Sequence, residues 1–165
     1  MEGAGAAAYF SVFGRTLRAP WSFASRTRRP SRDPVNALLS FGYTMLLSNV
    51  VGAICIVGLD LCVGFLHPEY RGRPALALDL MEEFRSPVVD RLVVGMLNQR
   101  LLSPEQFKDL EDGGVLMDRT ARKVFLRHFL RRLNVKATDE NTGRIASFRD
   151  HIMLQAQFFL RALKP

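Results

Sequence analysis

Apolar positions recur every three or four residues along most of the chain, which is the spacing of one face of an α-helix. Helical segments are predicted at residues 2–18, 34–58, 74–85, 88–102, 104–112 and 118–133, and a last one holds residues 152–163. No run alternates convincingly between apolar and polar residues, as a strand would. The pattern predicts an all-α fold, a compact bundle of about six or seven helices in one domain spanning residues 1–165.

Punctuating residues set the expected boundaries. Asp33 is a plausible N-cap with Pro34 in the first helical position, and Ser86-Pro87 is expected to divide two helices. In the amphipathic helix 118–133, one face is expected to pack and the other to stay in solvent. The packed positions are Val124, Phe125, Phe129 and Leu133, and the solvated ones are Arg122, Lys123, Arg127, Arg131 and Arg132.

The stretch 34–59 contains no charged residue and exceeds the roughly 20 residues that cross a bilayer. Its polar residues Asn36, Ser40 and Tyr43 follow the helical spacing i, i+4, i+7 and so form one edge. We therefore expect a helix buried in a protein core with one polar edge, and no membrane contact. A transmembrane helix is the alternative.

Charge is distributed unevenly, with a net +7 overall and 19 Arg among the 23 basic residues. Residues 1–34 carry +4, residues 35–118 carry −5 and residues 119–165 carry +8. Arginine suits phosphate oxygens, so a nucleic acid or another polyanion is a candidate partner. Cys55 and Cys62 lie in apolar sequence without a CxxC pair, which favours buried free thiols over a disulfide or a structural zinc site.

Three carboxylates share one helical face, because Asp79, Glu82 and Glu83 are spaced i, i+3, i+4. His67 precedes Asp79 by twelve residues, in a loop punctuated by Gly and Pro. Such a donor set suits Mg²⁺ or Mn²⁺. Solvated surface carboxylates and a hydrogen-bonded loop histidine are the alternative from the residues alone.

A basic stretch between Pro20 and Pro34 contains Arg26, Arg28, Arg29 and Arg32, and Trp21 and Phe23 precede these arginines within it. Arginines beside prolines and aromatic residues suit contact with a phosphate backbone, and a solvated loop is the alternative. The sequence contains no GxSxG, P-loop or dinucleotide-binding fingerprint.

Three strings carry a specific likeness: EGAGAAAYF, RRPSRDPVNALLSFGYTMLLSNVVGAI and GLDLCVGFLHPEYRGRPALALDLMEEFR. In this order and spacing they resemble the CRISPR-associated integrase/endonuclease, the first-numbered of the Cas proteins and the catalytic subunit of spacer acquisition. The likeness runs from Glu2 to about Gln155. It implies the α-helical catalytic domain of that family, without the N-terminal β-rich domain that the family also has.

The resemblance implies a metal held by Glu2, His67 and Glu82, with Asp79 as a supporting carboxylate, so that His67, Asp79 and Glu82 are the expected catalytic residues. It implies a Mg²⁺- or Mn²⁺-dependent DNA endonuclease and integrase that inserts spacer DNA by attack of a 3′-hydroxyl on a phosphodiester. The expected DNA contacts are Arg28, Arg29, Arg32, Arg73 and Arg85, with Arg127 and Arg131 on the basic helix.

The implied partners are double-stranded DNA (prespacer and CRISPR repeat), a second subunit in the full-length family, and a small ferredoxin-like Cas adaptation protein. The implied location is the prokaryotic cytoplasm. The chain departs from the family where Leu61-Cys62 replace a frequent Pro and aromatic residue, and in its start one residue before the first expected ligand. A non-catalytic DNA-binding or assembly remnant of the enzyme is therefore the alternative function.

Overall fold

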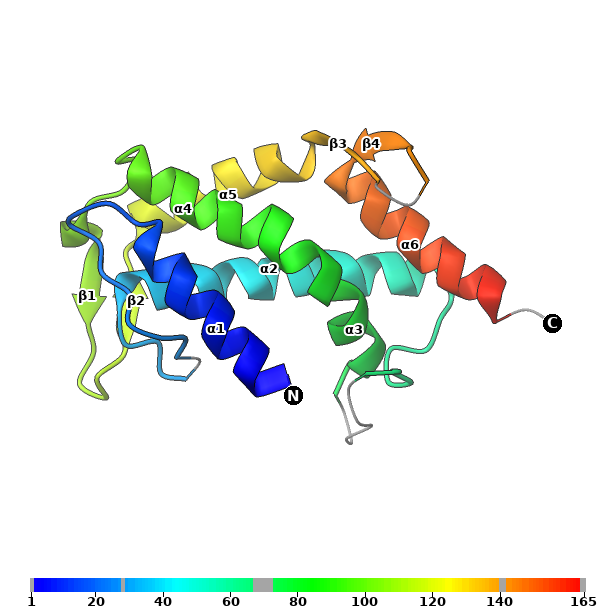
Figure 1. Ribbon diagram of the computed structural model, residues 1–165, viewed down its shortest axis with the longest axis horizontal. Helices are drawn as coiled ribbons and strands as arrows, with labels where there is room; N and C mark the ends of the chain where they lie inside the picture. The colour runs from blue at the N-terminus through cyan, green and yellow to red at the C-terminus, as the bar shows by residue number, and fades with distance from the viewer. Residues whose placement is uncertain (1, 28, 67–72, 140–141, 164–165) are drawn as a thin grey trace. The chain divides into compact units, whose positions relative to one another are not determined.

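A computed structural model of the chain describes residues 2–27, 29–66, 73–139 and 142–163, and the side chains of residues 2–4 and 6 lie outside this description. The helical elements are α1 (Glu2–Arg15), α2 (Pro34–Val57), α3 (Ala75–Phe84), the π-helix η1 (Arg85–Asp90), α4 (Arg91–Asn98), the 3₁₀ turn η2 (Pro104–Gln106), α5 (Arg119–Leu133) and α6 (Phe148–Ala162). The strands are β1 (Phe107–Asp109), β2 (Val115–Met117), β3 (Lys136–Thr138) and β4 (Ile145–Ser147) (Figure 1).

The expected count of six or seven helices is wrong for the described residues. Elements α3, η1 and α4 follow one another without a break from Ala75 to Asn98 and count as one helix. With α1, α2, α5 and α6, the described residues therefore form five continuous helices. The predicted division at Ser86-Pro87 does not occur. A proline lacks an N–H and clashes with the carbonyl four residues before it in an α-helix. The wider π-helical turn over Arg85–Asp90 accommodates the proline, so the chain stays helical.

The fold is rich in helix but not purely α-helical, because two antiparallel hairpins interrupt it. In the first, Phe107 pairs with Met117 and Lys108 with Leu116, where a short helix was expected. In the second, Lys136 pairs with Ser147 and Thr138 with Ile145, around the predicted polar turn. Each strand has only three residues, too few for an alternating pattern to stand out.

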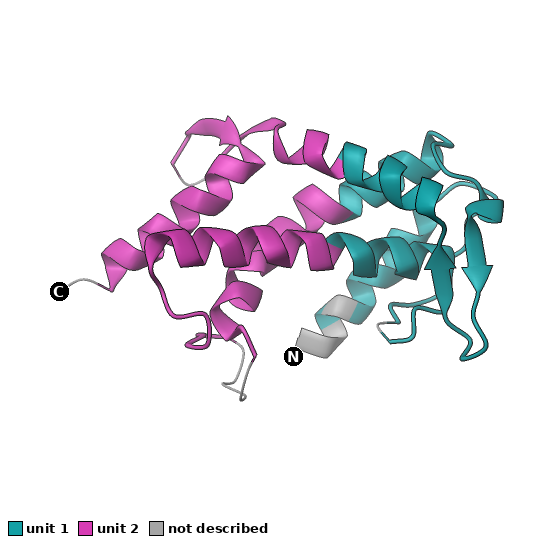
Figure 2. Ribbon diagram, turned by 180° about the vertical axis from the view of Figure 1, so that it is seen from behind, with its two compact units in different colours: residues 1–42, 90–128 teal, residues 43–89, 129–165 magenta. Residues whose placement is uncertain are grey.

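The chain divides into two compact units, residues 1–42 with 90–128 and residues 43–89 with 129–165 (Figure 2). Unit 1 has its own buried apolar residues, among them Val35, Leu38, Leu39, Val93, Met96, Leu97 and Phe125. Unit 2 has another set, among them Leu46, Val50, Ile54, Leu80, Phe84, Phe129, Leu133 and Ile152. Helices α2 and α5 contribute residues to both sets.

Helix α2 begins as the sequence predicts. Asp33 Oδ1 accepts the backbone N–H of Asn36 at 2.8 Å, which satisfies one of the free donors of the first turn. The helix has 24 residues, and its most apolar stretch has a mean hydropathy of 1.7, enough to cross a membrane by length and composition. Only 28% of its most apolar stretch is buried, so the expectation of an enclosed helix holds for part of it. The expected polar edge is present, with Asn36 fully buried among hydrogen-bond partners.

Helix α5 confirms most of its predicted amphipathic pattern, since Phe125, Phe129 and Leu133 are fully buried. Arg132 is an exception to the expected solvated face. Its Nε and Nη2 donate to the carbonyl of Pro87 at 2.9 and 2.5 Å, and its guanidinium lies 5.0 Å from the centre of the Phe148 ring. The cysteines also differ from expectation, because both are free but exposed.

Candidate functional site

The acidic face of α3 is built as the spacing predicts. Helix α3 buries Leu76, Leu80 and Phe84, which leaves the carboxylates on its other side. Asp79 is half-buried and Glu83 is exposed. Each of the three carboxylates has different neighbours: Asp79 contacts the preceding loop, Glu82 pairs with Arg85, and Glu83 is influenced by Asp139 and His151.

Asp79 holds the preceding loop. Its Oδ2 accepts the backbone N–H of Phe65 at 2.5 Å and that of Leu66 at 2.9 Å. A third bond, from the N–H of Leu76 to the carbonyl of Leu61 at 3.0 Å, joins the same loop to the first turn of α3. The carboxylate is therefore a clamp on the loop that ends, in the described residues, at Leu66.

Gly64 allows this loop to approach the helix closely. A Cβ at this position would lie 2.7 Å from the Cβ of Ala75 and 2.9 Å from Oδ2 of Asp79. Ordinary carbon–carbon contacts are about 3.5–4.0 Å, so no larger side chain fits without movement. The absence of a side chain at Gly64 is thus part of the geometry of the clamp.

Glu82 is paired with Arg85 in the next turn. Oε1 of Glu82 lies 2.9 Å from Nη1 of Arg85, and the two side chains are 36% and 26% exposed. The guanidinium of Arg85 also lies 5.2 Å from the centre of the Tyr43 ring, a cation–π distance. Its Nε is buried with no hydrogen-bond acceptor in the described part of the chain. Arg85, expected as a DNA contact, therefore fixes Glu82 in this structure.

Glu83 lies beside the second hairpin and α6. Its side chain reaches solvent, but the surrounding protein removes part of its hydration, and this desolvation raises the pKa of Glu83. The negative charge of Asp139 raises this pKa further, whereas the charge of His151 lowers it. The ring of His151 lies 2.9 Å, Nε2 to oxygen, from the carbonyl of Ala137.

Several predicted site residues lie outside the described part of the chain. His67 and Arg28 are outside it altogether, and Glu2 begins α1 but its side chain is not described. Within the described residues, no group of three or more His, Cys, Asp or Glu could hold a metal ion. The donor that is described, the partly exposed carboxylate of Glu82, is of the hard oxygen type that Mg²⁺ and Mn²⁺ prefer.

The predicted basic contacts fall into two groups. Arg29 and Arg32 are exposed, as are Arg127 and Arg131 on α5. Arg73 is half-buried just before α3. An exposed guanidinium can meet a phosphate without first leaving a protein partner, so the first four are the better candidates for nucleic-acid contact.

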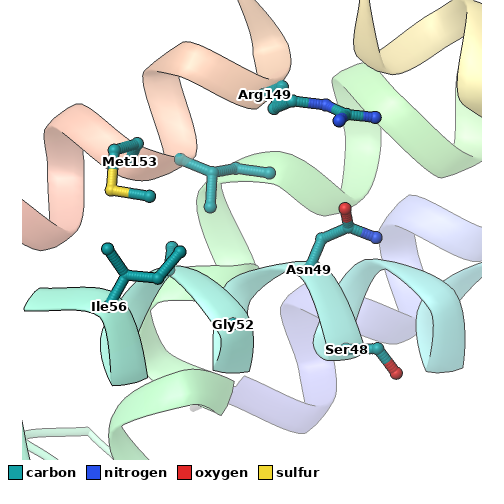
Figure 3. A pocket seen from close by; sticks show the side chains of 8 residues that line it. Ser48, Asn49, Gly52, Ile56, Arg149 and Met153 are labelled. Atoms are coloured by element: carbon teal, nitrogen blue, oxygen red, sulfur yellow. The ribbon is translucent and has the colours of Figure 1, made fainter.

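A cavity of about 350 Å³ lies between α2 and α6 within unit 2 (Figure 3). Asn49 and Ile56 line it from α2, and Arg149 and Met153 line it from α6. The complete lining also includes Ser48, Gly52, Ala53 and Ile152. Because no carboxylate, histidine or cysteine lines it, this cavity lacks the donors of a metal site.

Comparison with known proteins identifies the family. The family model described as "CRISPR associated protein Cas1" matches residues 1–131. The chain belongs to the Cas1 family. A relative named "CRISPR-associated endonuclease Cas1 1" from Thermus thermophilus is 44% identical over 162 residues, which cover 98% of this chain and 50% of the relative. The resemblance found in the sequence is thus confirmed.

Two solved structures extend the comparison. A structure titled "Casposase bound to integration product" matches with a TM-score of 0.87 and 28% identity, covering 99% of this chain and 47% of that one. A chain in the "Cas6-RT-Cas1--Cas2 complex" matches with a TM-score of 0.85 and 28% identity, covering 98% of this chain and 17% of that one. The chain spans about half the length of the curated Cas1 relatives it matches.

Three parts of this site were not predictable from the sequence. The loop clamp at Asp79, the close approach at Gly64 and the ring of Tyr43 under Arg85 all depend on contacts between residues far apart in the chain. The i, i+3 spacing of Glu82 and Arg85 is a signal that could have shown their pairing.

Proposed function

We propose that this Cas1-family chain is the α-helical catalytic part of a metal-dependent DNA endonuclease and integrase of CRISPR adaptation. The carrying observation is the clamp of Asp79 on residues 65 and 66, one helical turn before Glu82. It ties the loop that leads to His67 in the sequence to the helix that carries Glu82. The loop up to Leu66, which precedes His67, and the helix that carries Glu82 are thereby joined within unit 2.

The proposed metal ligands are Glu2, His67 and Glu82, and this assignment rests on the family motifs. A bound Mg²⁺ or Mn²⁺ would polarise the scissile phosphate and stabilise charge on the leaving oxygen. The chain itself supplies an oriented carboxylate, because the guanidinium of Arg85 pairs with Glu82. The ring of Tyr43, 5.2 Å from that guanidinium, limits its movement. Asp79 is a positioning residue, since its Oδ2 accepts two backbone N–H groups of the loop.

The proposed reaction exchanges one phosphodiester for another. The 3′-oxygen of a prespacer strand attacks the phosphorus at the end of a CRISPR repeat and forms a new P–O bond. The P–O bond from that phosphorus to the 3′-oxygen of the strand being cut breaks, and that oxygen takes up the proton which the attacking hydroxyl loses. With water as the nucleophile, the same displacement is strand cleavage.

The proposed DNA contacts are Arg28, Arg29, Arg32, Arg127 and Arg131, together with Arg73, just before α3, and Arg85, directly after it. Backbone contact of this kind tolerates many sequences and weakens as salt is added. The exposure of Arg29, Arg32, Arg127 and Arg131 supports such backbone contact. One structural neighbour is a casposase bound to an integration product and the other belongs to a complex with Cas2, which supports DNA and a Cas protein as partners. That the DNA is double-stranded and that the Cas protein is small and ferredoxin-like rests on the family resemblance. We further propose a cytoplasmic protein that pairs with a second copy in its full-length form.

The test compares adjacent carboxylates on one helix. Glu82→Ala and His67→Ala are expected to abolish Mn²⁺ binding in calorimetric titration and Mn²⁺-dependent cleavage of branched DNA. Glu83→Ala is the matched control, because it removes the next carboxylate on α3 and is expected to retain both activities. Unchanged cleavage in His67→Ala would show that the site is wrongly assigned. DNA binding by the parent without any Mn²⁺ binding would favour the non-catalytic module.

A further inference from the structure

We propose that Asn36 is a positioning residue for DNA binding, which shapes the basic segment (residues 25–27 and 29–33) against the start of α2. This inference rests on the proposed DNA contacts of Arg29 and Arg32. Asn36 is fully buried, and it is one of only three buried polar or charged residues in the described part of the chain. A fully buried amide is costly unless all of its hydrogen-bonding groups are used.

All the groups of the Asn36 amide are used by the basic segment. Its Oδ1 accepts from Nη1 of Arg26 at 2.8 Å and from the backbone N–H of Thr27 at 2.9 Å. Its Nδ2 donates to the carbonyl of Ser25 at 2.9 Å and to Oδ2 of Asp33 at 2.6 Å. Two donors and two acceptor positions are thus filled, which is the full capacity of the side chain. A single residue therefore joins both ends of the basic segment.

Arg26 extends this network along α2. Its Nη2 donates to Oγ of Ser40 at 3.0 Å, and that hydroxyl lies 3.0 Å from Oγ of Ser31. The guanidinium of Arg26 is therefore engaged within unit 1. Arg29 and Arg32 remain exposed on the same segment. The network thus separates one structural arginine from two that can meet phosphates.

The first hairpin also contacts the segment. The N–H of Val115 donates to the carbonyl of Ser31 at 2.7 Å, and just before the segment the rings of Trp21 and Phe107 meet edge to face with centres 5.7 Å apart. The segment is thus fixed between α2 and the hairpin within unit 1. A segment ordered before binding avoids the entropy cost of being ordered by DNA. Without Asn36, DNA binding would have to order the segment, and this entropy cost would lower the affinity.

The experiment measures DNA affinity of the full 165-residue chain over a range of salt concentrations. Replacing both Arg29 and Arg32 by Ala is expected to reduce the slope of log K against log salt by roughly two, about 0.9 for each lost phosphate contact. Asn36→Ala is expected to weaken binding by about tenfold and to reduce the slope by about one to two. The strand-transfer rate at saturating DNA should remain that of the parent, so the effect falls on affinity alone.

Asn98→Ala is the matched control in the same unit. The Asn98 amide also links backbone groups, accepting from the N–H of Arg18 at 2.9 Å and donating to the carbonyl of Thr16 at 2.8 Å. Its loss is expected to lower thermal stability without changing the salt slope. A merely structural role for Asn36 predicts that Asn36→Ala behaves in the same way.

An exchange within the network supplies a rescue. Asn36→Asp places a second carboxylate against Asp33 and is expected to weaken binding. Asp33→Asn combined with Asn36→Asp restores a donor–acceptor pair between the two positions and keeps the acceptors for Arg26 and Thr27, but the carbonyl of Ser25 loses its donor. The double variant is therefore expected to recover part of the affinity that Asn36→Asp loses. This pair of variants also carries the test if Asn36→Ala fails to fold.

The outcomes separate the inference from the function on which it rests. If the Arg29 and Arg32 variant binds weakly while every folded Asn36 variant keeps the parent's affinity and slope, the role of Asn36 is wrong and the DNA contacts stand. If the Arg29 and Arg32 variant also binds like the parent, the proposed DNA track fails, and the role of Asn36 fails with it.

Discussion

Substitution of Gly64 by Ala probes the loop clamp most directly. The added methyl group would lie 2.7 Å from the Cβ of Ala75 and 2.9 Å from its carbonyl carbon. Ala75 is fully buried in the first turn of α3, so the helix has no room to move back. Reaching an ordinary contact of about 3.5–4.0 Å requires the loop to shift by roughly 1 Å.

The shift acts on two short hydrogen bonds. The donor–acceptor distances from Phe65 and Leu66 to Oδ2 of Asp79 are 2.5 and 2.9 Å, and an added 1 Å takes them to or beyond the limit of a hydrogen bond. Hydrogen bonds to a charged group contribute about 1.5–3 kcal/mol each, and water replaces part of that at an exposed loop. We expect a destabilisation of about 1–3 kcal/mol. Displacement of a catalytic group by about 1 Å lowers a rate roughly 100-fold.

The assay is Mn²⁺-dependent strand transfer on branched DNA, with unfolding by urea measured in parallel. Gly95→Ala is the control, since a Cβ at Gly95 in α4 meets no atom within 4 Å. Because Ala is favoured over Gly inside a helix, this control should gain about 0.5–1 kcal/mol and keep its activity. Full strand-transfer activity in Gly64→Ala would refute the argument that the clamp positions the site.

Other predictions concern stability. Tyr9→Phe removes the 2.6 Å bond from the phenol to the buried carboxylate of Asp90, and should cost about 1–3 kcal/mol in urea unfolding at pH 7. Because the folded-state pKa of Glu83 is raised, its contribution to stability is present below the unfolded pKa near 4.5 and is lost as pH rises through the folded value. Glu83→Gln should therefore raise the melting temperature at pH 7 but not at pH 4, and an equal change at both would contradict the shift. Ser147→Ala removes the N-cap of α6, whose hydroxyl accepts from the N–H of Asp150 at 3.2 Å, and should cost about 0.5–2 kcal/mol. The Ser147 hydroxyl also lowers the pKa of Asp150, so this cost should be larger at pH 7 than at pH 3, and a pH-independent cost would contradict that cause.

The helices were predictable where local chemistry specifies them. Asp33 and Pro34 mark the start of α2, and the apolar positions of α5 identify its buried face. Strands of three residues carry no usable periodicity, so both hairpins escaped prediction. The continuous helix through Pro87 was also missed, because the wider π-helical turn overrides the usual effect of proline.

In the candidate site, too, the features set by helical spacing were predictable, and the contacts set by tertiary folding were not. Helical spacing alone places Asp79 and Glu82 on one face of α3. It does not indicate that Asp79 binds backbone 13 and 14 residues upstream, because that partner depends on how the loop folds back. Arg26 was grouped with the solvent-facing arginines of the basic segment, and only its bonds to Asn36 and Ser40 distinguish it.

The central claim is that a divalent ion bound through Glu82 and His67 supports strand transfer. The most direct measurement is calorimetric titration of Mn²⁺ into the parent, Glu82→Ala and Glu83→Ala chains, with cleavage of branched DNA followed on the same samples. We predict that binding and cleavage are lost together in Glu82→Ala and are kept together in Glu83→Ala. Cleavage that persists in Glu82→Ala, or that is lost equally in both variants, would contradict the assignment.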